Sequence, residues 1–205
     1  MFVKALKRRG KTVGMTGDGV NDILALRDAD CSVAMASGSE AASNAAQLVL
    51  MDSDFAKMPS VVAEGRRVVN NIQKAATLYL TKNIFSLFLA LFSVINVLSY
   101  PLTPSQITLI SMFTIGIPSF VVSLEPNKSL IKGKFLTNVF KTAAPAGITT
   151  FISVSSLVIF GEVFEINKEC ISTSSTMLVA LVGFMILAKV LSPASKLHVA
   201  LIAAR

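Results

Sequence analysis

The sequence has 205 residues, of which 53% are hydrophobic and 15% are charged, and its mean hydropathy is +0.66. This composition is too apolar for a soluble domain of this length, so it predicts a membrane protein. The formal net charge of +7 does not indicate nucleic-acid binding, because the basic residues form no stripe with interleaved aromatic residues. Charged residues crowd between Lys4 and Lys74, whereas positions 75–124 contain Lys82 alone. A polar first part therefore precedes an apolar second part.

The first part alternates short apolar runs with segments that favour helices. Strands are expected at Thr12–Met15, in "CSVAM" and in "QLVLM", and helices in "ILALRDAD" and after Ser39, a candidate N-cap. Repetition of strand and helix at this short spacing predicts a parallel α/β sheet. Acidic loops at 18–22 and 52–54 follow the first and third strands, and ligands of such sheets bind beyond the carboxyl ends of the strands.

The second part is predicted to be a bundle of membrane helices. An amphipathic pattern from Phe55 to Gln73 continues into an apolar stretch with no turn cluster between them, so we expect one rigid helix that enters the membrane. Four apolar stretches have close to the ~20 residues that a spanning helix needs. They cover 75–98, 103–124, 139–160 and 174–192. After Leu197 the chain is apolar but too short to span again.

Basic residues flank alternate ends of these stretches, as the positive-inside rule requires. The connection after the first stretch is uncharged and the connection after the third is net acidic. We therefore expect a multi-pass plasma-membrane protein whose α/β part, 125–141 connection and C-terminus are cytoplasmic. The basic residues that support this topology are Arg66, Arg67, Lys74, Lys128, Lys132, Lys134, Lys141, Lys189 and Lys196.

The run "GDGVND" places two carboxylates in a glycine-rich turn between a strand and a helix. Such turns often bind phosphate through backbone N–H groups, but Asp18 and Asp22 would repel a bare phosphate. Carboxylates combined with phosphate oxygens suit Mg2+, and Gly17 and Gly19 allow the backbone to turn both side chains toward one ion. Asn21 could donate a hydrogen bond to a phosphoryl oxygen. A solvated Asp-Gly turn is the simpler alternative.

The segment "MTGDGVNDILALRDADCSVAMASGSEAASNAAQLVLMDSDF" resembles the end of the phosphorylation domain of P-type ATPases, cation pumps of the haloacid dehalogenase superfamily. The following "VVAEGRRVVNNIQKAATLYLTKN" resembles their stalk and fifth membrane helix. The resemblance implies a partial haloacid dehalogenase-like parallel sheet followed by an all-α transmembrane bundle. It assigns residues 1–57 to the phosphorylation domain, 58–74 to the stalk and 75–205 to a transmembrane domain with a truncated C-terminus.

The same resemblance implies roles for the turn residues. Asp18 and Asp22 would bind Mg2+, Asn21 would help to hold the phosphoryl group, and Thr16, Gly17 and Gly19 would shape the loop. The phosphorylated aspartate of the family lies in a D-K-T-G-T motif, which this sequence does not contain. We therefore expect a missing N-terminal portion to supply the nucleophile, the nucleotide-binding domain and further membrane helices. The isolated chain is expected not to hydrolyse ATP.

Polar and irregular positions in the first two apolar stretches indicate an ion path. Lys82 and Asn83 lie about 10 Å into the first stretch, where a charge is costly unless it faces a cavity or snorkels to the interface. Gly116 and Pro118 interrupt the second stretch, with Ser111 and Thr114 adding oxygens nearby. Irregular backbone at that depth is tolerated where it lines a site, although a simple kink is an alternative.

The resemblance also bears on the transported ion. Asn83 and Thr114 match ion-ligand positions of calcium and sodium pumps, whereas two acidic ligands of those pumps correspond here to Ser86 and Ile115. The pattern "FTIGIPSFVVSLEPN" is similar to a bacterial subgroup linked to calcium or magnesium. The leading hypothesis is therefore the C-terminal part of an ATP-driven cation pump. The alternatives are a non-catalytic membrane module that acts only with other chains, and a membrane-tethered phosphatase.

Overall fold

The computed structural model describes residues 2–127 and 129–191. The chain divides into two compact units, residues 1–62 and 63–205. Lys128, Lys196 and the short apolar segment after Leu197 lie outside the described residues, so their predicted places in the topology stay predictions.

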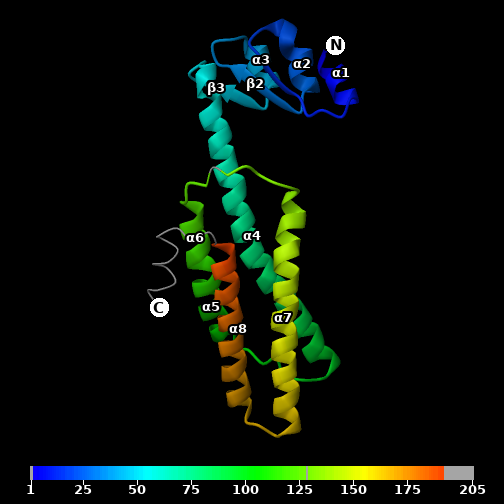
Figure 1. Ribbon diagram of the computed structural model, residues 1–205, viewed down its shortest axis with the longest axis vertical. Coiled ribbons are helices and arrows are strands. Elements are labelled where there is room, and N and C mark those ends of the chain that lie inside the picture. The colour runs from blue at the N-terminus through cyan, green and yellow to red at the C-terminus, as the bar shows by residue number, and fades with distance from the viewer. Residues whose placement is uncertain (1, 128, 192–205) are drawn as a thin grey trace. The chain divides into compact units, whose positions relative to one another are not determined.

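The first unit contains a three-stranded parallel sheet with the strand order β1-β2-β3 (Figure 1). Ser39 caps a helix as predicted, because its Oγ accepts a hydrogen bond from the Ala42 N–H at 3.1 Å. The predicted α/β arrangement is therefore confirmed. The elements in chain order are α1 (Phe2–Arg8), β1 (Gly14–Gly17), the 3-10 turn η1 (Val20–Asp22), α2 (Ile23–Asp28), β2 (Cys31–Met35), α3 (Glu40–Ala45), β3 (Leu48–Leu50) and the 3-10 turn η2 (Phe55–Lys57).

Strand β1 begins at Gly14, two residues later than the predicted start at Thr12. Val13 bonds instead to the turn between α2 and β2, where its N–H donates to Asp30 Oδ2 at 2.9 Å and its carbonyl accepts the Asp30 N–H at 2.9 Å. The Val13 carbonyl also accepts the Cys31 N–H of β2 at 3.3 Å, so Asp30 withdraws the Val13 N–H from the ladder and shares its carbonyl. Helix α1 was not predicted, and Lys7 joins it to the same turn through a 2.9 Å ion pair with Asp30.

The second unit is helical (Figure 1). Four segments are long and apolar enough to cross a membrane, which confirms the number of predicted spans. Helix α4 is unbroken for 38 residues, as the amphipathic pattern before the first apolar stretch predicted. The helices are α4 (Met58–Ile95), α5 (Pro104–Ser111), α6 (Ile117–Ser123), α7 (Phe135–Val163) and α8 (Lys168–Val190), and the π-helical turn η3 (Met112–Gly116) joins α5 to α6.

Glycines allow the helices of this unit to approach closely. A Cβ added to Gly147 of α7 would lie 2.7 Å from Ile84 Cγ2 of α4. A Cβ on Gly161 would lie 2.4 Å from Ile171 Cδ1, where α7 meets α8. Small residues at helix contacts serve the packing of membrane helices, since lipid provides no hydrophobic drive between them.

The second span is irregular where the sequence predicted it. In η3 the Ile117 N–H donates to the Met112 carbonyl, five residues back, instead of the α-helical position four residues back. Pro118 follows without an N–H to donate, so the ladder changes its spacing at this point. Pro118 is buried and Gly116 is exposed.

Candidate functional site

The aspartate turn closes on itself between β1 and α2. The Asp22 N–H donates to the Gly19 carbonyl at 3.1 Å, and the Gly19 N–H donates back to Asp22 Oδ2 at 3.3 Å. This reciprocal pair forms because Asp22 lies three residues after Gly19, at the end of η1. One oxygen of Asp22 is thus engaged in the turn, and the other oxygen has no hydrogen-bond donor among the described residues.

Glycine is required at two positions around this turn. A Cβ on Gly17 would lie 2.6 Å from Asp22 Cβ and 2.9 Å from its Oδ2, so the Asp22 carboxylate occupies the space that a side chain would take. A Cβ on Gly38 would lie 2.4 Å from the Asp18 carbonyl oxygen. The Ser39 N–H donates to that same oxygen at 2.7 Å. The connection between β2 and α3 therefore supports the backbone of Asp18.

The remaining predicted residues of the turn are accessible. Thr16, Asp18 and Asn21 are exposed, and their side chains make no hydrogen bond within the described part of the chain. No group of three His, Cys, Asp or Glu side chains among the described residues could hold a metal ion. Asp18 and Asp22 are thus a pair of carboxylates without a third such side chain beside them in the described part of the chain.

The second acidic loop is engaged in local contacts. Asp52 forms an ion pair with Lys57, and this hydrogen-bonded ammonium lowers the pKa of Asp52 and has its own pKa raised. Asp54 caps η2, where its Oδ1 accepts the Ala56 N–H at 2.9 Å. Asp52 and Asp54 are thus engaged in local contacts, unlike Asp18 and one oxygen of Asp22.

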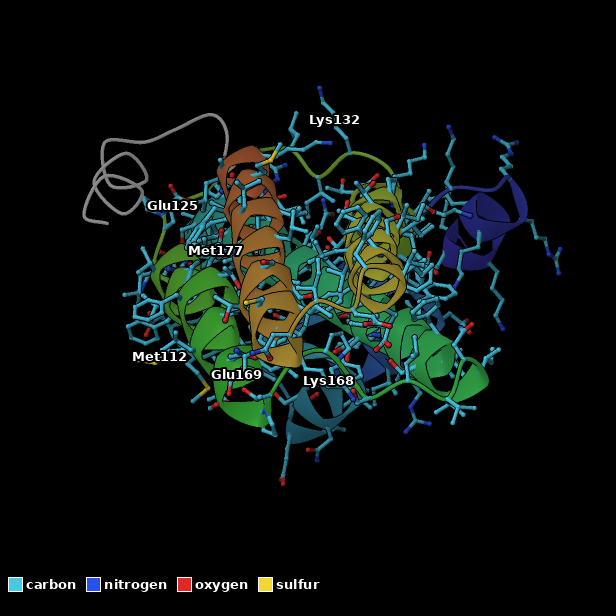
Figure 2. All side chains as sticks on the ribbon, turned by 90° about the horizontal axis from the view of Figure 1, so that it is seen from below. Met112, Glu125, Lys132, Lys168, Glu169 and Met177 are labelled. Carbon is cyan, nitrogen blue, oxygen red and sulfur yellow. The ribbon has the colours of Figure 1, made fainter. Side chains whose placement is uncertain are left out.

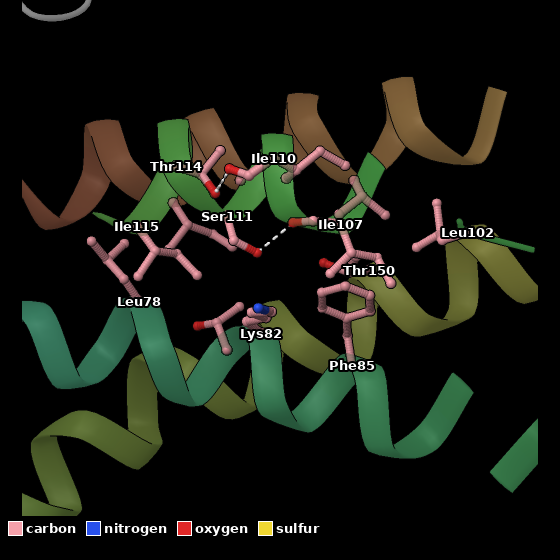
Figure 3. A pocket seen from close by; sticks show the side chains of 14 residues that line it. Leu78, Lys82, Phe85, Leu102, Ile107, Ile110, Ser111, Thr114, Ile115 and Thr150 are labelled. Atoms are coloured by element: carbon pink, nitrogen blue, oxygen red, sulfur yellow. Dashed lines mark hydrogen bonds between the residues drawn. The ribbon is translucent and has the colours of Figure 1, made fainter. Parts of the chain in front are cut away.

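The helical unit encloses a cavity of about 40 Å³ between α4, α5, η3, α7 and α8. This volume exceeds the roughly 10–15 Å³ that one water molecule needs. Lys82 and two of the predicted hydroxyl residues, Ser111 and Thr114, line it, as Figure 3 shows. The other lining residues are Leu78, Thr81, Phe85, Leu102, Ile107, Ile110, Ile115, Thr150, Val179, Gly183 and Ile186.

The hydroxyl groups of this cavity present acceptor oxygens. Ser111 Oγ donates to the Ile107 carbonyl at 2.6 Å, and Thr114 Oγ1 donates to the Ile110 carbonyl at 2.7 Å (Figure 3). Because each hydrogen is given to the helix, each oxygen keeps lone pairs for a ligand. None of the lining residues is acidic, and Lys82 is the charged residue among them. The cavity therefore offers neutral oxygens beside one ammonium group.

Other predicted ion-path residues lie outside this lining. Asn83 is exposed on α4, and Ser86 Oγ lies 3.4 Å from the hydroxyl of Tyr100. Thr81 and Thr150 line the cavity although the sequence analysis did not select them. The position of Thr81 directly before Lys82 was an available signal, whereas no sequence pattern distinguished Thr150.

The chain was compared with known proteins. No protein-family model matches it. It is 41% identical to the calcium-transporting ATPase CtpE of Mycolicibacterium smegmatis over 98% of its own length and 27% of the relative. It is 39% identical to CtpE of Mycobacterium bovis, over 99% of the chain and 27% of the relative. It is 40% identical to the probable cation-transporting ATPase exp7 of Streptococcus pneumoniae, over 90% of the chain and 25% of the relative.

The chain belongs to the P-type cation-transporting ATPases. Its resemblance covers nearly all of its own residues, including both the aspartate turn and the four apolar helices. The chain spans about a quarter of the length of these relatives. Together with its four helices, this membership identifies a membrane protein.

Proposed function

We propose that the chain is the C-terminal part of an ATP-driven cation pump. The observation that carries the proposal is the combination of a two-aspartate turn, held by Gly17 and Gly38, with a helical unit whose cavity is lined in part by hydroxyl groups. The names of the relatives support a cation as the transported species. Among cations, we favour calcium or magnesium.

In this proposal, Asp18 and the free oxygen of Asp22 hold Mg2+ against a phosphoryl group. The bound ion would neutralise charge that builds up during phosphoryl transfer. Asn21 is exposed beside the turn and would donate to a phosphoryl oxygen, while Thr16, Gly17 and Gly19 set the shape of the loop. The ordered Asp18 backbone matters because it places the carboxylate before the ligand arrives.

The phosphorylated aspartate would come from a preceding portion of the pump. One side of β1 pairs with β2, and its other side has no partner strand among the described residues. A parallel strand added at that edge would end beside Asp18, because the carboxyl ends of parallel strands meet at one edge of the sheet. We therefore expect the isolated chain to show no acid-stable phosphorylation from ATP.

The test of the catalytic proposal uses the full-length protein. Asp18→Asn and Asp22→Asn should each abolish Mg2+-dependent phosphorylation, measured as acid-stable label from ATP. Asp54→Asn is the matched control, because Asp54 also follows a strand but caps η2, which asparagine can do as well. Full phosphorylation in both site variants would exclude the proposed Mg2+ role. Absent phosphorylation of the unsubstituted full-length protein would favour a non-catalytic membrane module.

The cavity beside Lys82 is the proposed part of the ion path in this chain. Ser111 and Thr114 would contribute oxygens to the cation, beside the Lys82 ammonium that lines the same cavity. Thr114 belongs to η3 (Met112–Gly116), so the irregular backbone of the second span lies at this cavity, which supports the proposal. Asn83 and Ser86 stay predictions for the path, since they do not line the cavity.

Ion-dependent ATPase activity of the full-length protein tests the path. Thr114→Val keeps the shape of the side chain and removes its oxygen. The cation concentration for half-maximal activity should therefore rise about tenfold, because the cation loses one contact about as strong as a hydrogen bond. Ser119→Ala is the control, because its buried hydroxyl has no partner among the described residues and lies outside the cavity. Unchanged cation dependence in both Thr114→Val and Asn83→Ala would refute the path.

The topology proposal places the α/β unit in the cytoplasm and the spans in the plasma membrane. Exposed Lys132, Lys134 and Lys141 lie at the connection between α6 and α7, whereas Glu162, Glu165 and Glu169 lie at the connection between α7 and α8. Lysines are retained on the cytoplasmic side of membranes. Labelling of single cysteines at positions 132 and 165 from either side of intact cells would test this arrangement. Outward labelling at position 132 would contradict it.

A further inference from the structure

A second and larger cavity lies within the helical unit, at the end where α7 and α8 join. Its volume is about 470 Å³, and the same end is viewed in Figure 2, where Lys168 and Glu169 are labelled. No residue of the 40 Å³ cavity takes part in its lining. The lining residues are Ser99, Tyr100, Pro101, Thr103, Gln106, Val158, Glu162, Lys168, Glu169, Ile171, Ser172 and Thr173.

The side-chain amide of Gln106, in the lining of this cavity, is held in one orientation by hydrogen bonds. Gln106 Oε1 accepts the Thr103 N–H at 2.9 Å and the Ser172 hydroxyl at 2.9 Å. The backbone N–H of Thr103 can only donate, which identifies the accepting atom as oxygen and leaves the Gln106 amide nitrogen as the free end. That nitrogen has no acceptor among the described residues. Gln106 therefore offers two N–H groups to an anionic or carbonyl oxygen.

The charged residues of the lining have both signs. Glu162, Lys168 and Glu169 are exposed, and none of them forms an ion pair within the described part of the chain. Two carboxylates suit an ammonium group, whereas Lys168 and the Gln106 amide suit an anion. A ligand that carries an ammonium and an anionic group on one short chain would satisfy both sets.

The surroundings of the cavity are those of a bilayer interface. It lies where α4, α7 and α8 reach the ends of candidate spans, and Tyr100 lines it, a residue type enriched at the membrane interface. At the same end of α7, the exposed rings of Phe160 and of Phe164, which follows the helix, contact each other with centroids 4.4 Å apart, although neither lines the cavity. These rings offer an apolar surface along which acyl chains can lie.

We propose that this cavity binds the headgroup of a phospholipid with a primary ammonium, as in phosphatidylethanolamine. The ammonium donates to Glu162 and Glu169, and the phosphate accepts from Lys168 and the Gln106 amide. A choline headgroup is disfavoured, because its trimethylammonium has no N–H to donate. The proposal concerns the lipid surroundings of the helical unit and does not depend on the proposed pump function.

A headgroup series on the unsubstituted protein is the first test. The full-length protein, purified and exchanged into defined lipid, is titrated with phosphatidylethanolamine, its N-methyl and N,N-dimethyl derivatives, and phosphatidylcholine, and bound lipids are counted by native mass spectrometry. We expect affinity to fall stepwise with methylation, by about tenfold or more over the series, since charge-assisted hydrogen bonds are lost. Equal binding of all four lipids would overturn the proposal, as would tighter binding of phosphatidylglycerol.

Substitutions locate the site in the second test. Glu162→Gln combined with Glu169→Gln should remove the preference for phosphatidylethanolamine over phosphatidylcholine. Glu165→Gln is the matched control, because Glu165 lies on the same connection and does not line the cavity. Circular dichroism checks that each variant stays folded. A preference retained in the double variant, or lost equally in the control, would refute the assignment to this cavity.

Discussion

The Lys74 ammonium of α4 lies 3.1 Å from Glu125 Oε2, directly after α6, and both side chains are only 19% exposed. Beside this pair, Asn71 Nδ2 donates to the Glu125 carbonyl at 2.8 Å. Asn70 Nδ2 donates to the Ser129 carbonyl at 3.0 Å. Asn70, Asn71 and Lys74, which lie within about one turn of α4, thus hold the connection between α6 and α7 against this helix.

The first prediction concerns this fastening. Lys74→Ala should lower the free energy of unfolding by about 1–3 kcal/mol, because it removes an ammonium that lies 3.1 Å from a largely buried carboxylate. A double-mutant cycle with Glu125→Ala, measured as thermal unfolding in nanodiscs, isolates the pair. Strictly additive effects of the two substitutions would show that the pair contributes nothing.

The second prediction compares two helical glycines. Gly147→Ala should destabilise the bundle by about 1–3 kcal/mol, since its Cβ would meet Ile84 and the Thr81 carbonyl oxygen at 3.1 Å or less. Gly65→Ala has nothing within 4 Å of the new Cβ, so it should stabilise α4 by up to about 1 kcal/mol. Thermal unfolding of the two variants in the same nanodiscs measures the difference, and equal shifts would be inconsistent with the close approach of α7 to α4.

The third prediction compares two glycines of β1. Gly17→Ala should displace the Asp22 carboxylate, and the Mg2+ concentration for half-maximal phosphorylation of the full-length protein should rise about tenfold or more, as for other groups that orient metal ligands. Gly14→Ala is the control, because its Cβ would come no closer than 3.9 Å to the Cys31 carbonyl oxygen. If both variants show the same Mg2+ dependence as the unsubstituted protein, the contact at Gly17 does not position the Asp22 carboxylate for the ion.

The fourth prediction concerns acid. A hydrogen bond from Lys7, together with the Val13 N–H, lowers the pKa of Asp30 below its ordinary 3.8. A lowered pKa in the folded state means that the ionised carboxylate stabilises the fold above about pH 4, and that this contribution is lost as pH falls through the lowered pKa. Asp30→Asn should therefore lower the urea concentration at the midpoint of unfolding at pH 7. Below pH 4 the stability of this variant should depend less on pH than that of the unsubstituted protein. Identical pH profiles for the two proteins would argue against this role.

Local patterns were sufficient to predict much of the fold. The strands at 31–35 and 48–50, the cap at Ser39 and the four apolar helices follow from short-range periodicity and residue type. The start of β1 was missed because the side chain of Asp30, 17 residues after Val13, takes up the Val13 N–H. A side chain that competes for ladder hydrogen bonds from that distance leaves no trace in a local pattern.

The sequence by itself determined the position of the aspartate turn between a strand and a helix and the membrane character of the second part, since both depend on neighbouring residues and on composition. Only the tertiary structure decided which polar groups share a cavity. Lys82 and Asn83 are adjacent, yet one lines the 40 Å³ cavity and the other is exposed. Successive residues of a helix point about 100° apart, so the rotation of each helix against its neighbours selects the residues that meet. At Gly147 and Gly183 a Cβ would meet Ile84 and Thr114, so the close approach of these helices depends on residues far apart in the sequence.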